Sequence, residues 1–195
     1  MIALLVIDMQ NAYFEDPALT ARQEQLVTAC NELLEAVRSN GHKALLIGTV
    51  HERDKSTWSL NMLDDDQGFI FRGSLQAQFV PGLAVDGLPQ LVKTRDSAFL
   101  GTDLLSRLRN WHVDEVVLAG VSTHNCIAQT GADAFARNIR VTYAQDATGS
   151  EDTRAAADML RILTAEYRQQ IQSNAEILGR LRGVDSSRLG TEGPA

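Results

Sequence analysis

The sequence is poor in residues that several protein classes require. Two cysteines among 195 residues are too few for a disulfide framework. The apolar N-terminus has no basic residue before it and is interrupted at Asp8, which is unlike a secretory leader. We therefore expect a cytoplasmic protein whose thiols stay reduced.

Positive charge and long apolar runs are also scarce. The 18 Lys and Arg residues do not cluster, and the 25 Asp and Glu residues give a formal net charge of −7, which would repel nucleic-acid phosphates. No apolar run approaches the roughly 20 residues that a membrane-spanning helix needs. We therefore expect neither nucleic acid nor a membrane as a partner, and a small molecule as the substrate.

What remains is the composition of an ordinary globular protein, 44% hydrophobic and 22% charged. A chain of this length can bury a substantial core as one domain, and we expect that domain to cover residues 1–182. The last stretch, 183–195, is polar and has almost no apolar content. It is expected to be a disordered tail.

Short apolar runs alternate with amphipathic helical patterns along the chain. This alternation predicts an α/β fold, a three-layer α/β/α sandwich around a central parallel sheet of five or six strands. The expected strands are Ile2 to Ile7, Ala44 to Thr49, Gln90 to Val92, Val116 to Ala119 and Val141 to Ala144, with a weak edge strand at Gln170 to Gln172.

The helical patterns fall between these strands. An apolar stripe from Leu26 to Val37 predicts the first helix, with Thr20 and Gln23 as a capping box. Later helices are expected around residues 104–108, 125–137 and 152–167. The segment 52–89 has no sustained periodicity, and a loop of that length is expected to form pocket walls or a subunit contact.

Three chemically active side chains each stand just after an expected strand, where open α/β sheets build their sites. They are Asp8, Lys93 and Cys126. Right-handed connections bring the first and fourth strands together, so Asp8 and Cys126 would flank one crevice. If the third strand lies two strands from the first, Lys93 starts roughly 10 Å away, and its loop must curl inward to bring the ammonium near Asp8.

If the three meet, they can perform covalent catalysis. Lys93 and a helix N-terminus would favour the thiolate of Cys126. Asp8 could take the thiol proton and later deliver it to a leaving amine. Backbone N–H groups of the turn 122–126 could bind the oxyanion, a contribution whose loss typically costs about 100- to 1000-fold in rate. The intermediate would be a thioester.

Each residue taken alone also has a structural interpretation. Cys126 could be a small buried hydrophobe, Asp8 a helix cap and Lys93 an exposed loop lysine. Cys30 lies on the apolar stripe of a helix and is assigned no chemistry. The spacing of the histidines fits no zinc motif. Only the convergence of the three residues argues for catalysis.

Three motifs in the same order resemble those of the isochorismatase-like cysteine hydrolases, a superfamily that includes nicotinamidases, N-carbamoylsarcosine amidohydrolase and isochorismatase. The matching segments are Leu5-Val6-Ile7-Asp8-Met9-Gln10-Asn11, Lys93-Thr94-Arg95 with Ser97-Ala98-Phe99, and Gly120-Val121-Ser122-Thr123 with Cys126. The resemblance implies an Asp8, Lys93, Cys126 triad. It also implies a homo-oligomer, either a dimer or a tetramer, and a cis peptide between Val121 and Ser122 that aims backbone donors at the oxyanion.

Two departures from the family pattern narrow the expectation. Nicotinamidases bind a metal through Asp-x-His after the second strand, whereas this chain has Thr49-Val50-His51 and no other histidine until His112. We therefore expect no metal and no cofactor, and nicotinamide becomes a weaker substrate candidate. Members that hydrolyse a vinyl ether can lack the cysteine, so the presence of Cys126 favours amide chemistry.

Six side chains are candidates for substrate contact, because they flank the motifs or belong to the irregular segment and its start. They are Phe14, His51, Trp58, Phe99, His124 and Asn125.

The sequence thus predicts a metal-independent hydrolase that cleaves an amide, ureido or carbamoyl C–N bond. Two alternatives stay open: a vinyl-ether hydrolase with Asp8 as general acid, and a non-catalytic protein that retains the fold. A dinucleotide-binding module is disfavoured because the turn at residues 8–11 has no glycine and the chain has no P-loop.

Overall fold

Six parallel strands form a single sheet, which confirms the predicted α/β fold. The computed structural model describes residues 1–183, so the tail expected at 183–195 lies outside the described residues except for Gly183. The strand order is β3-β2-β1-β4-β5-β6. The strands are β1 (Ile2–Ile7), β2 (Lys43–Thr49), β3 (Gln90–Lys93), β4 (Glu115–Gly120), β5 (Arg140–Thr148) and β6 (Gln170–Gln172).

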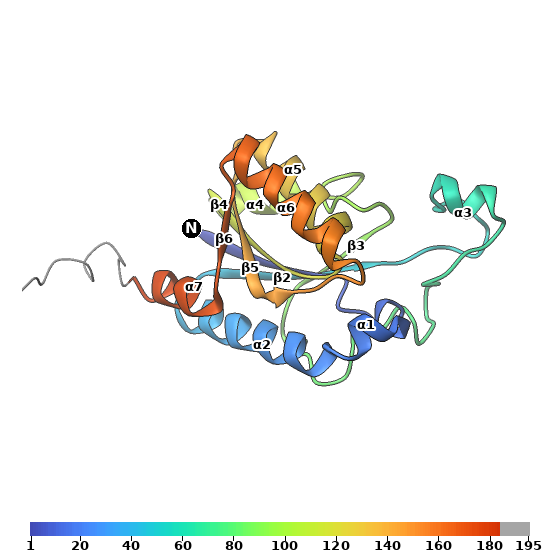
Figure 1. Cartoon of the computed structure of the whole chain (residues 1–195), viewed down its shortest axis with the longest axis horizontal. Coiled ribbons are helices and arrows are strands. Elements are labelled where there is room, and N and C mark those ends of the chain that lie inside the picture. Colours follow the sequence, from blue (N-terminus) through green and yellow to red (C-terminus); the bar gives the residue numbers. More distant parts are fainter. Residues whose placement is uncertain (184–195) are drawn as a thin grey trace, which may run out of the picture.

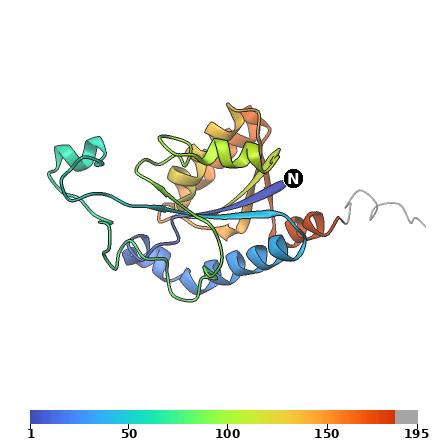
Figure 2. The same cartoon turned by 180° about the vertical axis from the view of Figure 1, so that it is seen from behind.

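Helices cover both faces of the sheet (Figures 1 and 2). On one side lie α1 (Pro17–Thr20), α2 (Gln23–Ser39) and α7 (Asn174–Leu181), and on the other lie α4 (Leu104–Asn110), α5 (Ala128–Phe135) and α6 (Thr153–Tyr167). None of these helices is long and apolar enough to cross a membrane, nor is any other in residues 1–183.

The alternation of side chains along each strand produces two separate cores. Leu4 and Val6 of β1 pack in the cluster under α2, while Leu5 and Ile7 pack in the cluster on the opposite face. Because both faces are covered, β1 is apolar throughout, as expected for a central parallel strand. Asp8 is the first polar residue to follow it.

The predicted capping box of Thr20 and Gln23 is wrong. Pro17 begins a separate short helix, α1, whose N-cap Asp16 accepts a hydrogen bond from the Ala18 N–H. Thr20 therefore ends that helix, and its hydroxyl donates to main-chain carbonyls behind it. Helix α2 then starts at Gln23 with no side-chain cap.

The segment between β2 and β3 leaves the body of the molecule and returns (Figures 1 and 2). Its one helix in the structure, α3 (Leu60–Asp64), stands at the far end of this excursion. Two isolated bridges, His51 with Phe71 and Gln10 with Phe79, tie the returning chain to the outgoing one and to the end of β1. The excursion starts at the carboxyl end of β2, beside the residues considered next.

Candidate active site

The strand order brings the three motif residues to one edge of the sheet. Ile7 pairs with Gly120, so the chain segments that follow β1 and β4 leave the sheet side by side. On the other side of β1, Thr49 of β2 pairs with Lys93 of β3. Lys93 is thus two strands from β1, the condition considered from the sequence, and its long side chain must cross the end of β2.

Lys93 does make that crossing. Its Nζ lies 2.8 Å from Asp8 Oδ2 and 3.3 Å from Cys126 Sγ. All three residues are nearly inaccessible, with exposed fractions of 0% for Asp8, 1% for Lys93 and 4% for Cys126. A buried ammonium needs compensating partners. Here it has a carboxylate on one side and a sulfur on the other.

Thr49 completes this cluster, and sequence reasoning missed it. Its hydroxyl accepts a hydrogen bond of 2.7 Å from Lys93 Nζ and donates one of 3.0 Å to Asp8 Oδ1. The Gln10 side chain holds the Thr49 main chain, since its Oε1 accepts from the Thr49 N–H and its Nε2 donates to the Thr49 carbonyl. The available signal was position: Thr49 ends the strand that separates β1 from β3.

The turn after β4 depends on a glycine. Gly120 has φ +112°, and a Cβ there would lie 1.9 Å from the Ile7 carbonyl oxygen. The next residue, Val121, donates its N–H to that same oxygen. The ends of β1 and β4 therefore approach more closely than any side chain at position 120 would allow. The peptide between Val121 and Ser122 is cis.

Cys126 belongs to a wide π-helical turn, Thr123–Ile127, that precedes α5. The predicted helix from 125 to 137 is therefore divided, and its α-helical part ends at Phe135. Among residues 1–183, neither the Ser122 N–H nor the Cys126 N–H has an acceptor outside this turn. Both residues line the cavity described below.

The electrostatics of the cluster differ in one respect from expectation. Burial, and then the Asp8 carboxylate, raise the pKa of Cys126 well above its usual value, although Lys93 acts in the opposite direction. The sequence predicts that Lys93 favours the Cys126 thiolate, and its ammonium does act in that direction, but burial and the Asp8 carboxylate outweigh it. Burial alone would lower the pKa of Lys93, but Asp8 and Cys126 raise it above the ordinary value, so its charge is retained.

A cavity of about 540 Å³ opens over Cys126. Of the substrate-contact candidates, His51 and Asn125 line it, and Ser122 does as well. The irregular segment supplies part of the wall, as the sequence predicted. Its lining residues are Ser59, Asn61, Met62 and Phe69.

The other four candidates lie elsewhere, and each has a structural reason. Phe14 is buried in the core under α2, and Phe99 is buried in the opposite core. Trp58 is buried against Phe71 and donates its indole N–H to a main-chain carbonyl. His124 turns its Nδ1 to the Ser150 hydroxyl, 2.6 Å away. Proximity in sequence to a motif did not fix where these side chains point.

The residues present do not fit the metal site of the nicotinamidases. Thr49 stands where their aspartate would be, and its hydroxyl is already bonded to Lys93 and Asp8. The Nδ1 of His51 is 2.9 Å from the Thr57 carbonyl oxygen. Within residues 1–183, no group of three or more His, Cys, Asp or Glu side chains is placed to hold a metal ion.

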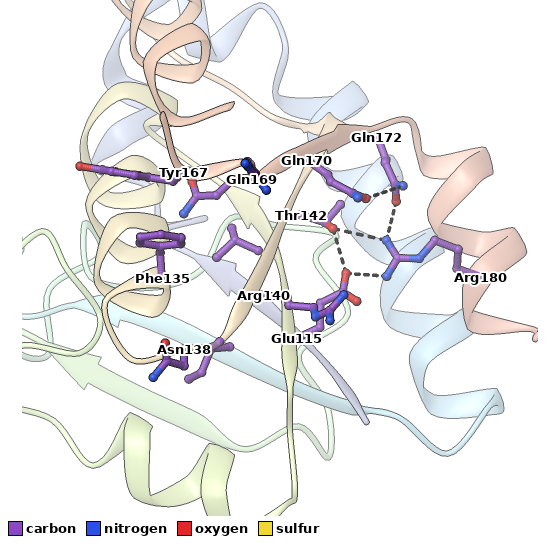
Figure 3. Close-up of a pocket in the computed structure, with 13 residues that line it drawn as sticks. Glu115, Phe135, Asn138, Arg140, Thr142, Tyr167, Gln169, Gln170, Gln172 and Arg180 are labelled. Carbon is purple, nitrogen blue, oxygen red and sulfur yellow. Dashed lines mark hydrogen bonds and ion pairs between the residues drawn. The ribbon is translucent and has the colours of Figure 1, made fainter. Parts of the chain in front are cut away.

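A second cavity, of about 560 Å³, lies at the amino-terminal ends of β4, β5 and β6 (Figure 3). Its centre is a hydrogen-bonded network. Arg180 donates to Glu115, Thr142 and Gln172, and the Thr142 hydroxyl also donates to Glu115. Phe135 and Tyr167 stack at its rim, with ring centroids 4.8 Å apart. No side chain of the triad reaches this cavity.

Comparison with known proteins gives consistent matches over nearly the whole chain. The family model for the Isochorismatase domain matches residues 2–175. A probable inactive nicotinamidase of Arabidopsis thaliana is 36% identical over 157 residues, which cover 76% of this chain and 80% of that protein.

Solved structures agree with these sequence matches. An isochorismatase family protein of Desulfovibrio vulgaris has a TM-score of 0.80 at 29% identity, covering 93% of this chain and 98% of that one. N-carbamoylsarcosine amidase from Thermoplasma acidophilum has a TM-score of 0.76 at 24% identity, covering 89% of this chain and 96% of that one, and this likeness is one of fold.

Proposed function

This chain belongs to the isochorismatase family, and we propose that it is a metal-independent cysteine hydrolase that cleaves an amide, ureido or carbamoyl C–N bond of a small molecule. The observation that carries the proposal is the contact of Cys126 Sγ with Lys93 Nζ, 3.3 Å, in a cluster that also holds Asp8 and opens into a cavity. A thiol, a base and an organising cation are the parts that nucleophilic amide cleavage requires.

The first half-reaction begins from the neutral thiol. As Sγ attacks the carbonyl carbon, its proton passes to Asp8. The negative charge of Asp8 disfavours a thiolate beside it, so proton transfer and attack by the sulfur are expected to occur together. The C–N bond of the tetrahedral intermediate then breaks, and the same proton leaves with the amine. The product is an acyl group joined to Cys126 as a thioester.

Charge on the tetrahedral intermediate needs donors that are in place beforehand. The N–H groups of Ser122 and Cys126 are suited to this, since they make no hydrogen bond outside their own turn among the described residues. Preorganised donors of this kind typically contribute about 100- to 1000-fold to the rate. The Val121–Ser122 peptide and Gly120 set the path of the backbone that carries them.

The second half-reaction returns the enzyme to its starting state. Asp8, again a carboxylate, takes a proton from water, and the resulting hydroxide equivalent attacks the thioester. The acid product departs, and the proton goes back to Cys126 Sγ. Lys93 stays charged throughout, holding Asp8 through the 2.8 Å ion pair and the Thr49 bridge.

A non-catalytic role is the second candidate, and one specific observation favours it. The Arabidopsis thaliana relative, at 36% identity, is described as a probable inactive nicotinamidase. That description concerns nicotinamide, a substrate that the absence of the metal-ligand pattern already disfavours here. A vinyl-ether hydrolase remains a third outcome, because it would use Asp8 without a covalent step.

The experiment is a screen of small primary amides, ureido acids and carbamoyl compounds that monitors ammonia release. Cys126→Ala should abolish turnover. Cys30→Ala is the matched control, since the buried Cys30 thiol, with its pKa raised to about 12 by burial, should not react. Ammonia release undiminished in Cys126→Ala would rule out a thioester on this residue. Vinyl-ether hydrolysis releases no ammonia, so it is assayed separately on a vinyl-ether substrate, where turnover retained in Cys126→Ala would point to that chemistry. Absence of turnover throughout, with an unreactive Cys126, would point to the non-catalytic role.

A further inference from the structure

We propose that the cavity selects small amides that carry a positively charged amine near the scissile carbonyl and rejects those that carry a carboxylate there, with Asp96 as the specificity-determining residue. This inference rests on the proposed function, since it names the substrate class of the same site. It concerns a side chain that the triad mechanism does not use.

Asp96 places a carboxylate oxygen beside the attacking sulfur. Its Oδ1 is 3.9 Å from Cys126 Sγ, while its Oδ2 accepts a hydrogen bond of 2.8 Å from Gln129 Nε2 on α5. The Gln129 contact therefore orients the carboxylate with Oδ1 toward the sulfur. Any carbonyl carbon that Sγ attacks must come within bonding distance of the sulfur. The substituents on that carbon then lie within reach of Asp96.

Apart from the Arg95 guanidinium, the charged side chains that line the cavity are acidic, as Asp96 is. Asp16 and Glu151 also line it. His51 lines it without adding a positive charge at neutral pH, because burial lowers its pKa below the usual value. The ammonium of Lys93 lies behind the sulfur and is paired with Asp8. A ligand carboxylate entering here would meet three carboxylates.

Arg95 is the only Lys or Arg among the lining residues of the described chain, and its guanidinium is committed to the main chain. Nη1 donates to the carbonyls of Thr57 and Thr94, and Nη2 donates to the carbonyl of Trp58. These bonds fasten the chain excursion that carries α3 to the loop after β3. Arg95 therefore acts as a structural anchor, which leaves it poorly disposed to receive a substrate carboxylate.

The kinetic test uses three primary amides of matched length: β-alaninamide, which is cationic, butyramide, which is neutral, and succinamate, which is anionic. For the wild-type protein, kcat/KM should fall in that order, with at least about a tenfold difference between the first and the last. Asp96→Asn should reduce the ratio of cationic to anionic kcat/KM about tenfold. A wild-type preference for succinamate, or a ratio unchanged by Asp96→Asn, would overturn the inference.

The variants separate a specificity role from a structural one. Asparagine can still accept the hydrogen bond from Gln129, so a residue that only holds α5 would show an unchanged charge preference. Asp103→Asn is the matched control, because Asp103 pairs with Arg107 on the exposed surface of α4 and does not line the cavity. Asp103→Asn should leave the ratio of cationic to anionic kcat/KM unchanged.

A second measurement keeps the inference distinct from the proposed hydrolysis. Methanethiosulfonate reagents form a disulfide with Sγ and release methanesulfinate, whether or not the protein turns over amides. In a Cys30→Ala background, the aminoethyl reagent should modify Cys126 faster than the sulfonatoethyl reagent, and Asp96→Asn should narrow that difference. If no amide is hydrolysed and this selectivity is present, the charge preference stands and the hydrolase proposal fails. Equal rates for the two reagents would contradict the charge preference.

Discussion

Two cavities of similar size lie at opposite ends of the sheet, and they differ in the functional groups that line them. The one at the carboxyl ends, about 540 Å³, exposes a thiol backed by a buried ion pair. The one at the amino ends, about 560 Å³, is centred on an arginine whose donors go to three neighbouring side chains (Figure 3). Cavity size alone therefore does not identify the reactive site.

The difference follows from the polarity of parallel strands. Every strand points its carboxyl end the same way, so residues at the end of β3 and after β1 and β4 converge there from segments far apart in sequence. At the amino ends, the interacting groups satisfy one another. Glu115 and Thr142 begin or lie near the start of their strands and share Arg180. The groups at the carboxyl ends include a thiol that lines a cavity, whereas those at the amino ends are joined in one ion-paired network.

The largest expected difference in activity and stability comes from removing the cation beside each cavity, Lys93 at the carboxyl ends of the strands and Arg180 at the amino ends. Lys93→Met should lower kcat/KM by about 10³-fold through loss of the group that orients Asp8, and should cost about 3–5 kcal/mol of stability because it leaves a buried carboxylate unpaired. Arg180→Met should cost about 1–3 kcal/mol and leave kcat/KM unchanged. Urea unfolding and ammonia release measure the two quantities. An active, fully stable Lys93→Met variant would contradict the comparison.

The glycine that lets β1 and β4 approach provides the next test. Gly120→Ala should destabilise the protein by about 3 kcal/mol or more, because its Cβ would collide with the Ile7 carbonyl and the backbone has positive φ. Gly87→Ala is the matched control, with φ +71° and nothing within 4 Å of its Cβ, and should cost about 1 kcal/mol. Equal unfolding midpoints for the two variants would show that the close approach is not required.

Removing one hydroxyl that bridges two side chains should have a smaller effect, and it should affect kcat at only one of the two cavities. Thr49→Val deletes the hydrogen bonds to Lys93 and Asp8, and we expect kcat to fall about 10- to 100-fold. Thr142→Val makes the same chemical change in the amino-end network and should lower stability by about 1 kcal/mol without affecting kcat. Steady-state kinetics on one amide settles the matter. A kcat unchanged by Thr49→Val would remove Thr49 from the cluster.

The smallest effect concerns the pH dependence of Cys126. Asp96 is one of the groups that raise the pKa of this thiol, so Asp96→Asn should shift the pH profile of alkylation to lower pH. Iodoacetamide rates between about pH 6 and 10, in a Cys30→Ala background, provide the measurement. Glu115→Gln, in the other cavity, should leave the profile in place. A shift of the profile toward higher pH would contradict the conclusion that Asp96 raises the pKa of Cys126.

Much of the fold and the triad could be predicted from sequence because both depend on local pattern. Five apolar runs correspond to β1–β5, and the weak signal at Gln170 to Gln172 corresponds to β6. Asp8, Lys93 and Cys126 lie at or after strand ends, where the rules of α/β topology place functional groups. The sequence predicts that the loop after the third strand curls inward to bring Lys93 near Asp8, whereas in the structure Lys93 ends β3 and its side chain spans the end of β2.

The direction of side chains in loops could not be predicted from local sequence patterns. Phe14 and Phe99 follow motifs closely, yet each is buried in a core, because tertiary packing and not sequence distance decides which way a loop residue points. From the sequence, Thr49 is only the last residue of an expected strand. Its role depends on the lateral neighbours of β2, which only the assembled sheet reveals.

The most direct test of the central claim is mass spectrometry of the protein during turnover of an amide substrate identified in the screen. We expect an adduct on the Cys126 peptide whose mass equals that of the substrate minus the departing amine, absent from Cys126→Ala and present in Cys30→Ala. Steady turnover with Cys126 unmodified under rapid quenching, and undiminished in Cys126→Ala, would contradict it.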